Sequence, residues 1–376
     1  MIYMDNAATT RMKPQVLQEM MPYMTDKYGN PSGIYRLASE SRKAVEDARA
    51  EIASLIGAKE NEIFFTSGGT ESDNWVLEYA HGLKNKKHII TSSIEHHAIL
   101  NKCKSLKEQG TYVSYAGVNE DGIIKTEDIK KCISENTGLV SVMMVNNEIG
   151  TIQPVKEISS IAKEKGAFFH TDAVAAFGNV KIDVNEAGID YLSVSAHKFC
   201  GPKGVGFLYA RDGKISPYHL GGAQESNLRA GTENVAGIVG MSVAARLAYR
   251  TMNIRNMQKK RIADYMIERI LREIPYSRLN GNRNKRVSGN MNFSFQYVDG
   301  GSLIIMLDRQ GICASAGSAC ASASKEPSHV LKAIGLPDDV CNGSVRFTIN
   351  EQITNNEADY CIKCLKNDII KLRQLY

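Results

Sequence analysis

A lysine that could act as a nucleophile stands at the end of an apolar run in SVSAHKFCGPKG, residues 193–204. Lys198 follows Ser195 and His197 and precedes a turn rich in glycine and proline. A lysine held at a strand end in partly apolar surroundings can have a lowered pKa, as Schiff-base chemistry with a carbonyl requires. An isolated lysine is more often a solvated surface charge, but the flanking His-Lys pair and the GPKG turn favour a functional one.

Two further segments place polar groups directly after apolar runs. HTDAVAAFG (170–178) puts Asp172 where ligands bind at the carboxyl edge of an α/β sheet, although a lone aspartate there is more often a helix cap. TSGGTES (66–72) combines glycines, hydroxyls and a predicted helix N-terminus, which could form a phosphate cradle or an ordinary capped turn. The chain has neither the Walker motif nor a G-x-G-x-x-G after a strand, so nucleotide hydrolysis and dinucleotide binding are unsupported.

A cysteine in a stretch of small residues is the fourth candidate. GICASAGSACASASKEPSHVL (311–331) surrounds Cys320 with glycine, alanine and serine, which cannot bury much surface. We therefore predict a mobile loop and an exposed, reactive thiol. Cys313 has larger apolar neighbours and is the better candidate for a structural role.

The elements that would position these groups follow from hydrophobic periodicity. Apolar runs rich in valine, isoleucine and phenylalanine alternate with helical stretches up to about residue 210, which predicts an α/β fold with a mainly parallel sheet and helices on both faces. A long helical stretch at about 235–274 then leads into a smaller α+β unit. We expect a large domain over 15–255, and a small domain over 1–14 and 256–376 that carries the cysteine loop at about 311–328.

The composition of the chain excludes several classes of function. The 376 residues include 46 Lys plus Arg and 41 Asp plus Glu, and the net charge of +5 is too mild and dispersed to indicate direct nucleic-acid binding. No run of about 18 apolar residues indicates a membrane span, and the N-terminus lacks the pattern of a signal peptide. Eight cysteines in such a chain are typical of reduced thiols, so we predict a cytoplasmic enzyme. No metal site is predicted, since C-x-x-C at 361–364 lies on a predicted helix without a second pair.

Taken together, these segments resemble the pyridoxal-phosphate-dependent cysteine desulfurases of the NifS/IscS type, within the class V aminotransferases. The resemblance runs nearly from end to end, and GSAC resembles the longer-loop branch of the family. The motifs that carry it are YMDNAATT (3–10), YGNPS (28–32), TSGGTES, EHHA (95–98), VNNEIG (145–150), HTDA, SVSAHK with GPKG, RAGTEN (229–234), GSAC followed by EPSHVL, and SVRFT (344–348).

The resemblance implies fold type I, a homodimer and pyridoxal 5'-phosphate as cofactor. It implies that Lys198 binds the cofactor covalently, that Asp172 pairs with the pyridinium nitrogen, and that His96 stacks on the ring and shuttles protons. The other implied cofactor contacts are Gly69, Thr70, Ser195 and His197, Asn147 at the ring, and Thr232 from the partner subunit at the phosphate.

The implied reaction converts L-cysteine to L-alanine and leaves a persulfide on Cys320 for a sulfur acceptor, either an iron–sulfur scaffold or a tRNA-thiolation enzyme. Arg346 would hold the substrate carboxylate in a bidentate fork, with Asn147 nearby. Three alternatives stay open: a selenocysteine lyase, a class V aminotransferase, and a catalytically weakened partner protein that keeps the fold.

Several positions depart from the family pattern. Ala175 stands where glutamine usually donates to the cofactor's phenolic oxygen, Tyr35 replaces a histidine, and Ser226 replaces an arginine. The stretch after Arg346 reads FTIN in place of FSLG. These departures bear on rate, substrate preference and acceptor, and leave the prediction of cofactor binding in place.

Overall fold

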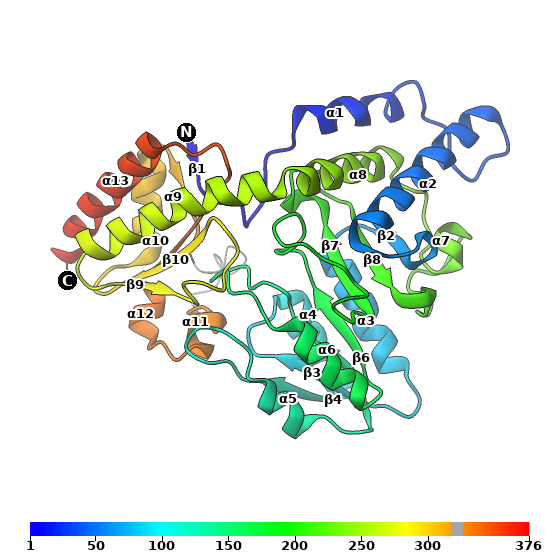
Figure 1. Ribbon diagram of the computed structural model, residues 1–376, viewed down its shortest axis with the longest axis horizontal. Coiled ribbons are helices and arrows are strands. Elements are labelled where there is room, and N and C mark those ends of the chain that lie inside the picture. Colours follow the sequence, from blue (N-terminus) through cyan, green and yellow to red (C-terminus); the bar gives the residue numbers. More distant parts are fainter. Residues whose placement is uncertain (317–325, 376) are drawn as a thin grey trace.

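The structure, a computed structural model, describes residues 1–316 and 326–375. Its centre is a seven-stranded sheet in the order β2-β8-β7-β6-β5-β3-β4 (Figure 1). Strands β7, β6, β5, β3 and β4 pair in parallel, whereas β8 is antiparallel to both of its neighbours. The predicted mainly parallel α/β sheet is therefore confirmed. The strands are β2 (Ile63–Thr66), β3 (His88–Ser92), β4 (Tyr112–Ala116), β5 (Thr137–Ser141), β6 (Phe168–Asp172), β7 (Tyr191–Ser195) and β8 (Gly206–Ala210).

Apolar side chains on both faces of this sheet are buried under helices. Leu139 and Tyr191 belong to a core cluster with side chains of α3 and α4, while the next residues, Val140 and Leu192, belong to a second cluster with side chains of α2, α6 and α8. Successive strand residues point to opposite faces, so a strand covered on both sides needs a continuous apolar run. The helices of this part are α1 (Pro14–Met20), α2 (Arg36–Ile56), α3 (Gly69–Gly82), α4 (His97–Glu108), α5 (Thr126–Cys132), α6 (Val155–Glu164), α7 (Gln224–Asn227) and α8 (Val235–Arg250).

The C-terminal part builds a smaller layer of helices on two small sheets (Figure 1). It has its own core cluster, in which Met4 packs with Met266, Phe293 and Leu365. The domain boundaries stay a prediction. The elements are α9 (Met252–Glu273), β9 (Ser277–Asn280), β10 (Asn290–Phe295), α10 (Gly300–Arg309), β11 (Ile312–Cys313), α11 (His329–Ala333), α12 (Asp338–Asn342), β12 (Ser344–Thr348) and α13 (Asn355–Arg373), with β1 (Ile2–Tyr3) paired to β11.

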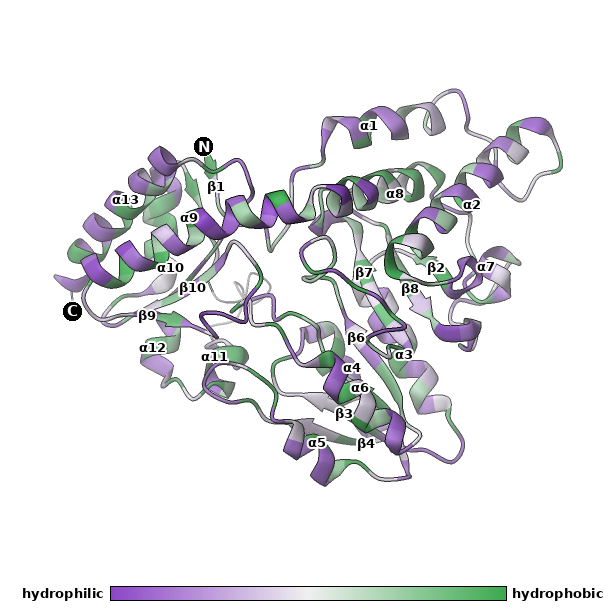
Figure 2. Cartoon of the chain, viewed as in Figure 1, coloured by the Kyte–Doolittle hydropathy of each residue, from purple (hydrophilic) through white to green (hydrophobic). Residues whose placement is uncertain are grey.

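The single helical stretch predicted over 235–274 is two helices. Thr251 leaves the helical conformation (φ −109°, ψ 4°) and separates α8 from α9. The two helices pack in different cores, because α8 packs with α1 and α2 while α9 contributes to the core cluster of the C-terminal part. Figure 2 shows the contrast: α8 is hydrophobic over most of its length, and α9 is largely hydrophilic with hydrophobic stretches.

The N-terminal segment ties the small part to the sheet. Asp5 forms an isolated bridge with Thr348, the last residue of β12, and the Ala7 N–H donates to the Thr348 hydroxyl at 2.8 Å. From there the chain passes the end of β7, where the Thr10 N–H donates to the carbonyl of His197 at 3.0 Å. Within the described residues, we find no helix with the length and hydropathy needed to cross a membrane.

Candidate active site

One cavity of about 400 Å³ gathers nearly all of the residues singled out from the sequence. Its walls come from the N-terminal segment, the carboxyl ends of the parallel strands and the small sheet. This is the edge at which α/β sheets bind ligands. The predicted residues that line it are Gly69, Thr70, His96, Asn147, Asp172, Ser195, His197, Lys198 and Arg346.

Lys198 lies just beyond β7, at the end of a short 3-10 helix (Ala196–Lys198), and is half-buried. Its Nζ donates to the carbonyl oxygens of Ala7 at 2.6 Å and Ala8 at 2.9 Å. Thr10 fixes this arrangement, because its hydroxyl donates to the His197 carbonyl at 2.7 Å and accepts from the Cys200 N–H at 2.7 Å. The amine is therefore held inside the cavity by backbone acceptors from a segment nearly two hundred residues away in the sequence.

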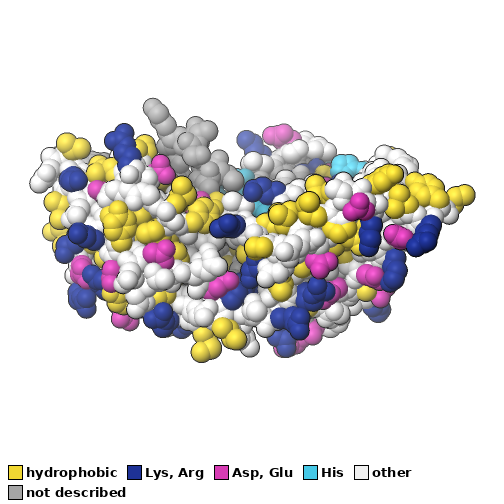
Figure 3. Space-filling model, turned by 90° about the horizontal axis from the view of Figure 1, so that it is seen from above, with side chains coloured by type: hydrophobic (Ala, Val, Ile, Leu, Met, Phe, Trp, Pro, Cys, Tyr) yellow, Lys and Arg dark blue, Asp and Glu magenta, His cyan; other side chains and the backbone are white. Residues whose placement is uncertain are grey.

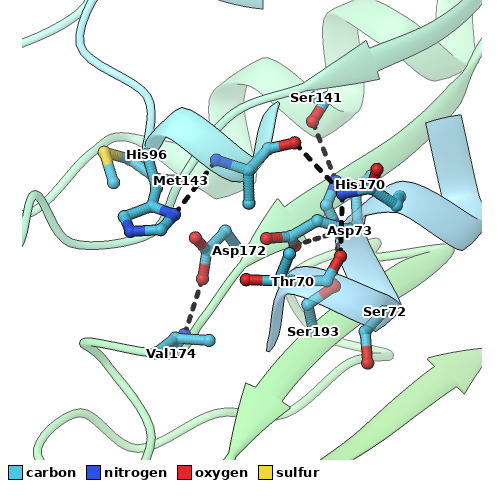
Figure 4. Close-up of polar contacts among 12 residues, drawn as sticks. Thr70, Ser72, Asp73, His96, Ser141, Met143, His170, Asp172, Val174 and Ser193 are labelled. Carbon is cyan, nitrogen blue, oxygen red and sulfur yellow. Dashed lines mark hydrogen bonds and ion pairs between the residues drawn. The ribbon is translucent and has the colours of Figure 1, made fainter. Parts of the chain in front are cut away.

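Asp172 and His96 face each other across the cavity (Figure 4). The Oδ1 atom of Asp172, at the end of β6, accepts from the Val174 N–H at 2.8 Å. Burial raises the pKa of Asp172, while His96, the Val174 N–H and Lys198 oppose the shift. His96 is the N-cap of α4 and its Nδ1 accepts from the Ala98 N–H at 3.2 Å, so the proton of the neutral ring lies on Nε2. Burial lowers the pKa of His96, with Asp172 opposing.

The turn between β2 and α3 has the form of an anion cradle. Helix α3 begins at Gly69, and a Cβ there would lie 2.5 Å from Cγ2 of Val174. Gly68 has φ of 151°, and a Cβ on Gly206 would lie 2.7 Å from the Cα of Gly68. Only glycine fits such close approaches, and Gly69 and Thr70 place the start of α3, where the first N–H groups of a helix lack partners within the helix, in the wall of the cavity. Thr70, in the first turn, is exposed.

Two side chains from the β7 end complete the cradle. Ser195 is buried, and His197 is half-buried with Nδ1 3.1 Å from the Thr9 hydroxyl. Burial, with help from Lys198 and Lys203, lowers the pKa of His197 to about 4. His197 is therefore a neutral hydrogen-bonding group at physiological pH.

Arg346 enters the cavity from β12 and is 1% exposed. Its Nη2 donates to Oδ1 of Asp5 at 2.8 Å, and its Nη1 donates to the carbonyl of Asn147 at 3.2 Å. Its Nε is buried and finds no hydrogen-bond partner among residues 1–316 and 326–375. A buried donor without a partner is costly, so this guanidinium is suited to receive an anionic ligand group.

Two predicted residues stand apart from this cavity. Thr232 is exposed and is absent from the described lining of the cavity, and its predicted place in a partner subunit's site stays a prediction. Cys320 lies outside the described residues. Among the departures, Ala175 lines the cavity and brings no side-chain donor, Tyr35 is 55% exposed, and Ser226 adopts a left-handed φ of 58° in α7.

Several lining residues were missed from the sequence. His329 follows the EPS of EPSHVL; its Nε2 lies 2.9 Å from the carbonyl of Glu95, and its ring centroid is 4.8 Å from that of His97. Glu95 and Asp73 also line the cavity, each 1% exposed. The motif EHHA contained Glu95 and also His97, which lines the cavity too, but a local pattern does not show which neighbours reach one cavity.

The sequence matches the aminotransferase class-V family over residues 2–361, and the chain belongs to this family. It is 48% identical to the cysteine desulfurase IscS of Dictyoglomus turgidum over all of this chain and 96% of that protein. It is equally similar to the IscS of Methanosarcina thermophila, over all of this chain and 93% of that protein. A solved NifS-like protein superposes with a TM-score of 0.93 at 35% identity, covering 98% of this chain and 99% of that one.

These relationships confirm the predicted fold type, the class of enzyme and pyridoxal phosphate as its cofactor. A structure described as SspA in complex with cysteine is 35% identical, with a TM-score of 0.83, over 94% of this chain and all of that one. The cavity fits the cofactor. An amine, a carboxylate at a strand end and a glycine-built helix N-terminus match its aldehyde, ring nitrogen and phosphate, and the unpartnered Arg346 Nε remains for a substrate.

Proposed function

We propose that this chain is a cysteine desulfurase that converts L-cysteine to L-alanine and leaves the sulfur as a persulfide on Cys320. The observation that carries the proposal is the joint placement of Lys198, Asp172 and His96 in one cavity with a guanidinium whose buried Nε has no hydrogen-bond partner among the described residues. The full-length relationship to curated cysteine desulfurases supports the same conclusion.

The residues would hold pyridoxal phosphate as follows. Lys198 would bind it covalently, Asp172 would pair with its ring nitrogen, and His96 and Asn147 would lie against the ring. When bound, the cofactor supplies an electron sink for bonds at the substrate's α-carbon. The phosphate would lie at Gly69, Thr70, Ser195 and His197, joined by Thr232 of the partner subunit.

The chain's own groups then have defined tasks. Arg346 binds the substrate carboxylate and fixes the orientation of the amino acid, because its position is set by Asp5 and the Asn147 carbonyl. His96 carries the proton of its neutral ring on Nε2, so this atom can donate a hydrogen bond inside the cavity, and a proton transfer through the ring would first require Nδ1 to exchange the Ala98 N–H for a second proton. Cys320, as thiolate, takes the sulfur: a sulfur–sulfur bond forms as the carbon–sulfur bond of the substrate breaks, and the electron pair of that bond stays with the substrate carbon, which is protonated to give alanine.

The experiment is to incubate the purified yellow protein with L-cysteine and a reductant and to measure alanine and sulfide. We expect equal amounts of both without any keto-acid acceptor, and a persulfide on Cys320 by mass spectrometry when the reductant is omitted. Cys320→Ser should abolish the persulfide, and Cys313→Ser, at a half-buried thiol outside the cavity, should not. Turnover of selenocysteine alone, or a requirement for a keto acid, would refute the proposal.

We also propose that the active form is a homodimer. Large hydrophobic side chains are exposed at Met24 (62%), Tyr28 (72%), Ile34 (102%) and Leu220 (87%). Figure 3 shows hydrophobic side chains gathered at one end of the molecule on the face that it draws. Exposed apolar patches of this kind mark interaction sites.

The sulfur acceptor is proposed to be an iron–sulfur scaffold or a tRNA-thiolation enzyme, and cytoplasmic location stays a prediction. Light scattering and transfer of labelled sulfur to each class of acceptor would test these points.

A further inference from the structure

Asp73 is a buried carboxyl group that the proposed reaction leaves without a task. It lies on α3, one turn after the glycine cradle, and it lines the cavity at 1% exposure. Its Oδ1 has no hydrogen-bond partner within the described part of the chain. The Nε2 atom of His170 lies 3.6 Å from Oδ1 of Asp73 (Figure 4).

His170 does not supply a positive charge to this carboxyl group. The imidazole is fully buried on β6, with Nδ1 2.8 Å from the Ser141 hydroxyl and Nε2 3.0 Å from the Ser193 hydroxyl. Burial lowers the pKa of His170 to about 3, so the ring is neutral at physiological pH. An ionised Asp73 would therefore be a fully buried charge beside a neutral ring, and although the Ser193 hydroxyl favours the ionised form, desolvation by burial outweighs it.

Asp172 has much better support for a negative charge. It accepts from the Val174 N–H at 2.8 Å, and His96 and Lys198 both favour its ionised form. In the described part of the chain, the ionisable groups that face Asp73 are instead Asp172, Glu95 and His170. Two neighbouring buried carboxyl groups do not both ionise, and the proton stays on the one with the poorer environment.

We propose that Asp73 is a neutral carboxylic acid. The negative charge of the pair formed by Asp73 and Asp172 then lies on Asp172. Asp73, His170, Ser141 and Ser193 then form an uncharged layer beside Asp172. For the cofactor, which rests on the proposed function, this means that a single negative charge faces the ring nitrogen. Asp73 is a positioning residue, because it acts through Asp172.

Infrared difference spectroscopy tests the protonation state directly, in holoenzyme and in cofactor-free protein. A protonated carboxyl group has a carbonyl stretch that an ionised one lacks. We expect Asp73→Asn to remove one component of this band at neutral pH, and Asp73→Ser, also uncharged and smaller, to remove the same component. Glu95→Gln is the matched control, because Glu95 is equally buried and its own proton gives a separate component. A band unchanged in both Asp73 variants would overturn the proposal.

Cofactor binding gives the second readout. Asparagine has the size of the neutral acid, so Asp73→Asn should retain the visible spectrum at neutral pH and an affinity for pyridoxal phosphate within about twofold of the wild type. If Asp73 were ionised and its charge supported the ring nitrogen, the same variant would bind about tenfold or more weakly, a loss of about 1.4 kcal/mol or more, and the proposal would fail. Wild-type protein that binds the cofactor but forms no alanine would refute the proposed function and leave the protonation of Asp73 standing.

Discussion

Replacing Arg346 with lysine tests the proposed substrate site at its most specific contact. Arg346 is 1% exposed, and its guanidinium already donates one hydrogen bond from Nη2 to Asp5 and one from Nη1 to the Asn147 carbonyl. Lysine keeps the positive charge but is a point donor that cannot reproduce a planar fork. Its ammonium can stay near Asp5, so the fold loses little, while the geometry available to a substrate carboxylate is lost.

The size of the effect follows from the hydrogen bonds involved. A hydrogen bond to a charged group contributes about 1.5–3 kcal/mol, so losing one of two bonds to the substrate carboxylate should lower kcat/KM for L-cysteine by about 10- to 150-fold. Cysteamine is cysteine without the carboxylate, so it makes no such bond. Its binding, followed by the change in the cofactor's visible absorbance, should be about the same in wild type and Arg346→Lys.

Two controls separate recognition from misfolding. Arg278→Lys makes the same change at an exposed position of β9 and should alter neither substrate. Thermal unfolding of Arg346→Lys should stay close to wild type, because the ion pair with Asp5 can persist. If cysteamine binding weakens as much as cysteine turnover, or if L-cysteine turnover is unaffected, Arg346 does not bind the carboxylate and the reasoning is wrong.

Three further predictions concern other groups of the cavity. Lys198→Ala should lose the cofactor's absorbance and all turnover while staying folded by circular dichroism; retained absorbance would contradict the assignment. Mixed dimers of one Lys198→Ala subunit and one Thr232→Ala subunit should keep one intact site if Thr232 serves the neighbouring subunit, and titration with cofactor should count it. Burial raises the pKa of Glu95 from 4.5 to about 8, so the folded protein holds this proton and loses stability as pH rises between those values. Glu95→Gln should remove a slope of up to about 1.4 kcal/mol per pH unit, and parallel pH profiles in denaturant unfolding would refute this.

The sheet could be predicted because burial on both faces restricts the residue type at every position of a strand. Strand β8, which reads GFLYA, is buried and apolar throughout for that reason, whereas β6 (FFHTD) and β7 (YLSVS) also bury polar residues, among them His170 and Ser193. Strand direction does not restrict residue types in this way, so the sequence could not show that β8 runs antiparallel to both neighbours. The break at Thr251 was also hidden, since both flanking segments are helical and only their different packing partners separate them.

The site was predictable where chemistry follows directly from a strand end, as it does for Asp172 and Lys198. Arg346 and Asn147 came only from the family resemblance, because nothing local marks an arginine on an apolar strand as a ligand for a substrate. Ala7 and Ala8 act through their carbonyl oxygens, which every residue has, so no residue type could indicate that they hold the Lys198 amine.

The distribution of charge in the cavity explains why so many titratable groups can be buried together. Burial lowers the pKa of His96 and sets that of His197 at about 4, so both rings are neutral donors and acceptors. Burial also holds the proton on Glu95 at neutral pH, and Arg346 is already paired with Asp5. Lys198 and Asp172 are the two groups to which the proposed function gives a charged role at the cofactor, while Glu148, Arg255, Lys259 and Glu351 also line the cavity. Neutral rings at His96 and His197 let Lys198 and Asp172 act in a low-dielectric space, where the interaction of each with the cofactor is strong.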